Sequence, residues 1–122
     1  MKHLFVPYEI AKKLKEKGFD EPCLMGFYQI TGIGVVLIEH YKVDDKDILM
    51  CDAPLYQQAV DWFREKHNLI LSYCRDGGYY FFTIQDLYDE DDQGAIDTGQ
   101  GASDSEYYIA FTNTIIEALK LT

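Results

Sequence analysis

The chain has 122 residues, of which 48% are hydrophobic and 15% aromatic, and its formal net charge is −10. This length and apolar content exclude a wholly disordered chain and suffice for one domain with its own core. The negative charge disfavours direct binding to nucleic acid, and the sequence contains no apolar stretch near the ~20 residues that a membrane span needs.

The first predicted elements are a helix and a β-hairpin. Val6, Ile10 and Leu14 recur at helical spacing, and Pro7 suits the first helical position. Gly18 is expected to end this helix in the left-handed conformation. Residues 27–31 and 35–41 are rich in strand-forming residues and flank a short turn that contains two glycines. This pattern predicts a hairpin directly after the helix.

The middle of the chain predicts a short strand and a second helix. Residues 48–51 are expected to form the strand. The helix is expected to follow an N-cap at Asp52 and a first-turn proline at Pro54, and to continue to about residue 67. Trp62 and Phe63 lie on its apolar stripe, so both are predicted to be buried in the core.

The last part predicts a second hairpin and a third helix. Residues 69–74 and 79–84 are the strands of the hairpin, and residues 103–106 have the spacing of a helix-starting capping box. The order α-ββ-(β)-α-ββ-α, with strands that pair locally, predicts an α+β fold rather than a doubly wound parallel sheet. We therefore expect one two-layer domain over residues 1–122, with antiparallel hairpins packed by three helices and an acidic loop at about 86–103.

Two sequence blocks carry a resemblance to a known group of proteins. Residues 5–23 (FVPYEIAKKLKEKGFDEPC) and 53–69 (APLYQQAVDWFREKHNL), together with a last helix that opens with tyrosine, cover about half of the chain. They resemble small uncharacterised proteins of gut Bacteroidetes, their phages and mobile elements. The resemblance implies a bacterial, cytoplasmic accessory protein encoded by a mobile element, and it implies no catalytic residues.

Acidic residues are concentrated in the last third of the chain. Between Arg75 and Lys120 there are ten Asp or Glu and not one Lys, Arg or His. Such a segment favours a partner protein with a basic surface. The residues proposed for this contact surface are Tyr79, Tyr80, Glu90 and Asp92.

The same segment offers an alternative function in binding a divalent cation such as Ca²⁺. Within residues 89–100, four side chains fall near ligand positions of an EF-hand loop: Asp89, Asp91, Gln93 and Asp97. However, Gln100 replaces the bidentate Glu that closes such a loop, and the flanking segments do not predict two helices. A solvated acidic loop explains the same residues.

The three cysteines indicate a reducing compartment and offer the third alternative. Cys23, Cys51 and Cys74 are far apart and form no close-spaced pair with one another or with histidine, which disfavours disulfides and a zinc site. Cys51 at a helix entrance is the best candidate for a reactive thiol, although Asp52 beside it opposes thiolate formation. The leading hypothesis is a non-enzymatic cytoplasmic protein that contacts another protein without a cofactor, and the thiol enzyme is the second alternative.

Overall fold

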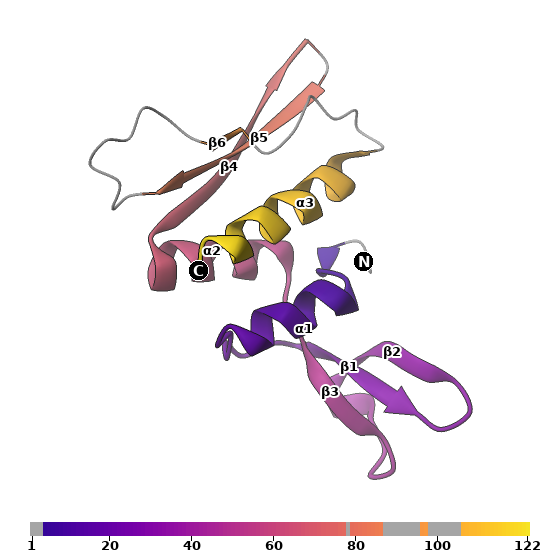
Figure 1. The fold of residues 1–122 in the computed structure, drawn as a ribbon. Coiled ribbons are helices and arrows are strands. Elements are labelled where there is room, and N and C mark those ends of the chain that lie inside the picture. Colours follow the sequence, from indigo (N-terminus) through magenta and orange to yellow (C-terminus); the bar gives the residue numbers. More distant parts are fainter. Residues whose placement is uncertain (1–3, 78, 87–95, 98–105) are drawn as a thin grey trace. The chain divides into compact units, whose positions relative to one another are not determined.

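The computed structural model describes residues 4–77, 79–86, 96–97 and 106–122, shown in Figure 1. The chain divides into two compact units, Met1–Gln58 and Ala59–Thr122. The described part confirms the predicted α+β fold, with three helices and antiparallel strands in the expected order. The strands form two three-stranded sheets, one in each unit.

The first unit combines one helix with the sheet β2-β1-β3. Its elements are α1 (Tyr8–Glu16), β1 (Met25–Ile30), β2 (Gly34–Glu39), a 3-10 turn η2 (His40–Lys42) and β3 (Ile48–Ala53). The rings of Tyr8 in α1 and Phe27 in β1 are 5.4 Å apart, so this side of β1 faces the helix. Because side chains alternate along a strand, Tyr28 lies on the opposite face.

The end of α1 follows the sequence prediction closely. Gly18 has φ of +101°, and the Phe19 N–H donates to the Leu14 carbonyl at 2.9 Å. This is the hydrogen bond of a Schellman end, in which a left-handed glycine satisfies carbonyls that the helix leaves unpaired. The sequence suggested Pro7 as the first helical position, but Pro7 occupies the N-cap and the helix begins at Tyr8.

The connection between β2 and β3 has to cross the sheet. Both strands are antiparallel to β1, which lies between them, so β2 and β3 point in the same direction. Residues 40–47 therefore pass from one end of β1 to the other. The face of β1 away from α1 is also covered, because Tyr28 on that face is only 6% exposed.

The predicted N-cap of the second helix is wrong. Helix α2 (Tyr56–His67) begins after β3, and Asp52 belongs to that strand. Gln58 provides the N-terminal hydrogen bond instead, because its Oε1 accepts from the Leu55 N–H at 2.9 Å. This is half of a capping box, in which the side chain of the third helical residue accepts a hydrogen bond from the backbone N–H of the residue that precedes the helix. The predicted burial of Trp62 and Phe63 is confirmed, at 2% and 0% exposed.

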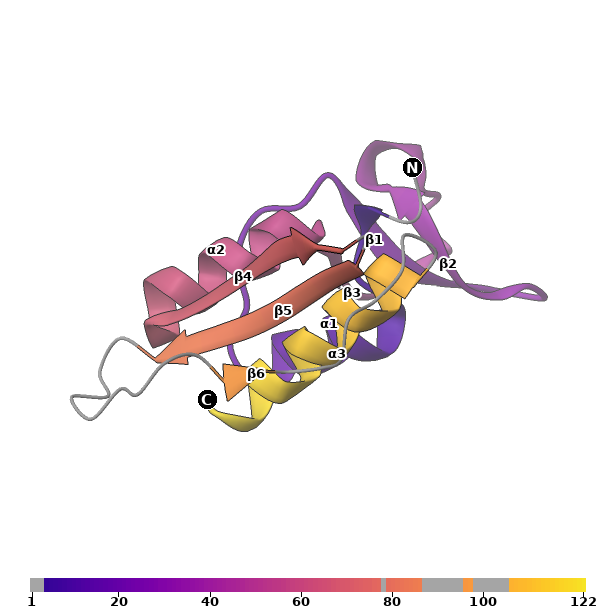
Figure 2. The same cartoon turned by 90° about the horizontal axis from the view of Figure 1, so that it is seen from above.

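The second unit packs a helix on the sheet β4-β5-β6. Its strands are β4 (Leu69–Asp76), β5 (Tyr79–Asp86) and β6 (Ile96–Asp97), and its last helix is α3 (Tyr107–Lys120). Figure 2 shows α3 running beside β5. Within the range predicted as an acidic loop, at about 86–103, the structure describes the short strand β6, in which Ile96 pairs with Ile84. The predicted cap Ser103 lies outside the described residues.

Candidate functional site

Aromatic side chains gather where the β4–β5 hairpin meets the start of α3. Tyr73 pairs with Phe82 across the hairpin, and Arg75 pairs with Tyr80, so all four side chains share one face. Tyr107 from α3 lies among them, with its ring centroid 5.5 Å from Tyr73, 4.8 Å from Tyr80 and 5.4 Å from Phe82. We call Tyr73, Arg75, Tyr80 and Tyr107 the tyrosine cluster.

The tyrosine cluster is ordered by its own packing and is open to solvent on one side. Its rings meet at steep angles, 87° for Tyr73 with Tyr107 and 72° for Tyr80 with Tyr107, an arrangement that aromatic pairs favour. Burial raises the pKa of Tyr107, and a hydrogen bond with Tyr73 raises it further, so its hydroxyl stays protonated at neutral pH. Tyr73 is still 52% exposed. The Arg75 guanidinium lies 5.5 Å from the Tyr80 ring centre, within cation–π range.

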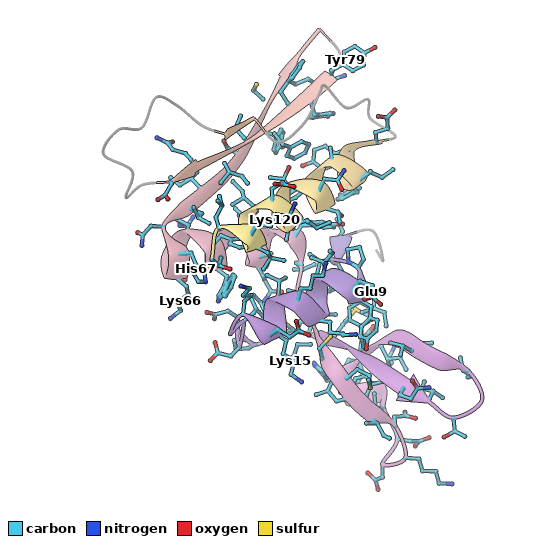
Figure 3. All side chains as sticks on the ribbon, in the orientation of Figure 1. Glu9, Lys15, Lys66, His67, Tyr79 and Lys120 are labelled. Carbon is cyan, nitrogen blue, oxygen red and sulfur yellow. The ribbon has the colours of Figure 1, made fainter. Side chains whose placement is uncertain are left out.

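The two tyrosines singled out by sequence lie on opposite faces of β5. Tyr79 is 50% exposed, and Figure 3 shows it at the turn end of the hairpin with its ring directed outward. Tyr80 is half-buried in the tyrosine cluster. A flat partner surface could therefore contact Tyr79 or Tyr80 but not both, because each tyrosine lies among the side chains of a different face.

A group of three polar side chains in the first unit joins the strands β1 and β3 to the turn η2. His40 Nε2 is 2.9 Å from Asp52 Oδ1 on β3, and His40 Nδ1 is 2.5 Å from the Tyr28 hydroxyl on β1. Burial raises the pKa of Tyr28, followed by the charges of Asp52 and Asp47, so the phenol keeps its proton and can donate to the imidazole. We call Tyr28, His40 and Asp52 the His40 triad.

The His40 triad connects the turn after β2 to the two other strands of the sheet. One ring nitrogen of His40 is engaged by Asp52 and the other by the hydroxyl of the buried Tyr28. The ring also lies against Gly26, where an added Cβ would come within 2.6 Å of His40 Cε1. The triad thus fixes the start of the crossing connection to the two strands beneath it.

The thiols show no sign of activation. Cys23 donates to the Glu21 carbonyl at 3.4 Å, and burial, with the charges of Asp52 and Glu21, raises its pKa to about 11. Burial also raises the pKa of Cys51, more than nearby Lys15 lowers it. A reactive cysteine needs a lowered pKa, so these two positions oppose the thiol-enzyme alternative. Cys74 is exposed.

The acidic residues nominated from sequence are hardly covered by the structure. Asp89, Glu90, Asp91, Asp92 and Gln93 lie outside the described residues, and of Asp97 only the backbone is described, paired with Thr83 in β6. Within the described ranges no group of three or more His, Cys, Asp or Glu side chains is placed to hold a metal ion.

The sequence analysis identified Tyr80 of the tyrosine cluster but no other member, and it missed the His40 triad. The His40 triad joins residues from three separate elements, and Asp52 was assigned to a helix cap. The tyrosine cluster had a usable signal, because Tyr80 and Phe82 alternate with Tyr79 and Phe81 and therefore share a face. The contribution of Tyr107 depends on how α3 packs on the hairpin, which periodicity alone does not specify.

Comparison with known proteins adds no further identification. No protein-family model, no curated protein and no solved structure matches this chain. Among the helices of the described residues, none combines the length and the apolar character needed to cross a membrane.

Proposed function

We propose that this is a non-enzymatic accessory protein that acts by contacting another protein, and that the tyrosine cluster is its contact surface. The observation that carries the proposal is a half-exposed Tyr73 held in place by Tyr107 beside an exposed Arg75. Tyrosine and arginine are enriched among the residues that dominate binding energy at interfaces. Rings that are already fixed lose little conformational entropy when a partner binds.

The proposed partner has a basic surface. Tyr80 and Tyr107 of the tyrosine cluster belong to the segment between Arg75 and Lys120, which carries ten acids and no Lys, Arg or His, and such a segment favours a basic partner. The raised pKa values of Cys23 and Cys51 support a role without a reactive thiol at these two positions. The resemblance of residues 5–23 and 53–69 supports a cytoplasmic, phage- or mobile-element-encoded role.

Binding measurements on the whole protein, with substitutions in the β4–β5 hairpin, test this proposal. Immobilised wild-type protein is expected to retain a basic partner from host lysate at low ionic strength and to release it as salt screens the charges. Tyr73→Ala should weaken retention, whereas Tyr79→Ala should not, because Tyr79 is equally exposed but lies on the other face. Tyr73→Phe, which keeps the ring, controls for lost packing and should retain most of the binding. An empty column at low salt, or a loss with Tyr79→Ala alone, would contradict the proposal.

A further inference from the structure

The two edge strands of the first sheet differ in how well they are protected from pairing with a further strand. In the order β2-β1-β3, β2 and β3 each have one side that pairs with β1 and one outer side. The outer side of an edge strand presents backbone N–H and C=O groups that can pair with another strand, and proteins protect such edges with lysines, bulges or covering segments.

The β3 edge has three such protections. Its register with β1 shifts between Phe27 and Tyr28, which leaves Met50 as the extra residue of a bulge. Lys15 from α1 donates its Nζ to the Met50 carbonyl at 3.2 Å, and Figure 3 shows this side chain extending from the helix. Just beyond the strand, the Val6 N–H donates to the Pro54 carbonyl at 3.0 Å.

The β2 edge has none of these protections among the described residues. It pairs with β1 in unbroken register from Met25↔Glu39 to Ile30↔Gly34. Its interior, Val35–Val36–Leu37–Ile38, is entirely apolar and contains no lysine or proline. Glu39 at its end already has an ion-pair partner in Lys42, at 3.6 Å. A regular, uncharged edge of this kind is the type that recruits another strand.

We propose that β2 pairs antiparallel with β2 of a second copy of the chain, so that the two sheets join across a twofold axis. Such an axis keeps corresponding faces of both sheets together. Centring it on Leu37 places Leu37 opposite Leu37 of the second copy, Val36 opposite Ile38 and Val35 opposite Glu39. Each apolar interior residue other than Val35 then meets another apolar residue, and no like charges lie directly opposite.

A second copy fits this edge better than a basic partner segment. The interior of β2 offers no carboxylate to a basic segment, whereas its apolar sequence is complementary to itself. One strand pair falls short of the ~1,200 Å² that stable interfaces bury, so the dimer should be weak and reversible. Two chains of charge −10 repel each other, so added salt should strengthen it. This is opposite to the salt dependence of the proposed basic-partner contact, which uses a different surface.

Sedimentation velocity over a range of protein concentrations and salt concentrations tests the dimer. We expect a shift from 14.1 kDa towards twice that mass as concentration and salt rise. Hydrogen exchange of the residue 34–39 amides should slow in step with the shift. A monomer up to near-millimolar protein in high salt, or a dimer that salt weakens, would overturn the proposal.

Charge variants at one exposed position identify the edge. Val35→Glu places a like charge opposite Glu39 of the second copy, twice per dimer, and should weaken association about twofold to thirtyfold. Val35→Lys places an opposite charge there and should strengthen it. Ile48 on β3 is the matched control, because Val35 and Ile48 both flank Gln29 and are 37% and 62% exposed. Ile48→Glu and Ile48→Lys change the net charge identically, so equal effects at both positions would refute pairing through β2.

Discussion

Substituting Gly26 by alanine tests whether the His40 triad holds its imidazole rigidly. The new Cβ would lie 2.6 Å from His40 Cε1, closer than carbon atoms tolerate, and 3.0 Å from Tyr28 Cε2, which is a tight contact. His40 cannot simply rotate away, because both ring nitrogens are engaged. Overpacking of this kind costs about 1–3 kcal/mol, and replacing glycine by alanine returns about 0.4–1 kcal/mol through the unfolded chain. Gly26→Ala should therefore destabilise the fold by about 1–2 kcal/mol, or about 4–8 °C in Tm.

A double-mutant cycle with His40→Ala isolates the contact. Removing the imidazole opens the space that the new methyl group needs, so the cost of Gly26→Ala should fall by at least about 1 kcal/mol in that background. Guanidinium unfolding followed by far-UV circular dichroism measures all four proteins. An equal cost of Gly26→Ala with and without His40, or a stabilising effect of Gly26→Ala on the wild-type chain, would refute a rigidly held imidazole.

Three further predictions concern the thiols, the tyrosine cluster and the core. With a pKa near 11, Cys23 should react with iodoacetamide about tenfold more slowly at pH 8 than an unperturbed thiol, since its small thiolate fraction outweighs its higher nucleophilicity. Peptide-resolved mass spectrometry can measure this, with the exposed Cys74 as the internal comparison. The labelling of Cys23 should rise steeply only towards pH 11. Because the pKa of Tyr107 is raised in the folded state, the folded chain holds this proton more tightly than the unfolded chain does. The protonated hydroxyl should therefore contribute its full stabilisation below pH 10, the ordinary pKa of tyrosine, and less above it, which unfolding measured at several pH values can show. The same loss of stability above pH 10 in Tyr107→Phe would show that Tyr107 is not its cause. Ile115→Ala, at a fully buried position of α3, should cost about 2–5 kcal/mol, whereas Ile109→Ala, at 63% exposed on the same helix, should change the free energy of unfolding by less than about 0.5 kcal/mol; similar losses at both would mean that α3 buries a different face.

Local signals in the sequence predicted the secondary structure well. The left-handed Gly18 and both hairpins depend on neighbouring residues, and the structure contains all three. The second strand of the first hairpin ends at Glu39 instead of residue 41, because residues 40–42 form the turn η2. Asp52 shows the limit of this reasoning. An aspartate two residues before a proline is typical of an N-cap followed by a first-turn proline, but β3 extends to Ala53, and the carboxylate pairs with His40 instead.

The candidate sites were harder to predict because they join distant residues. Tyr28, His40 and Asp52 come together only because β1 lies between β2 and β3, and the sequence does not specify that strand order. Tyr73 and Tyr80 could have been placed on one face from the hairpin register, since their neighbours pair across a short turn. Tyr107 joins them through packing between α3 and the hairpin, for which the helix periodicity gave a face but no position.

The strand order of the first sheet also imposes an order of assembly. Ile30 and Gly34 are brought together by a tight turn, so the β1–β2 hairpin closes with a small loss of chain entropy. Met25 meets Ala53 only after the crossing connection has been laid over the hairpin, so β3 should dock later. Substitutions of Asp52 should then accelerate unfolding and leave the folding rate almost unchanged, while substitutions in the β1–β2 turn should slow folding. The hydrogen bond between His40 and Asp52 would accordingly slow unfolding of the first unit rather than speed its folding.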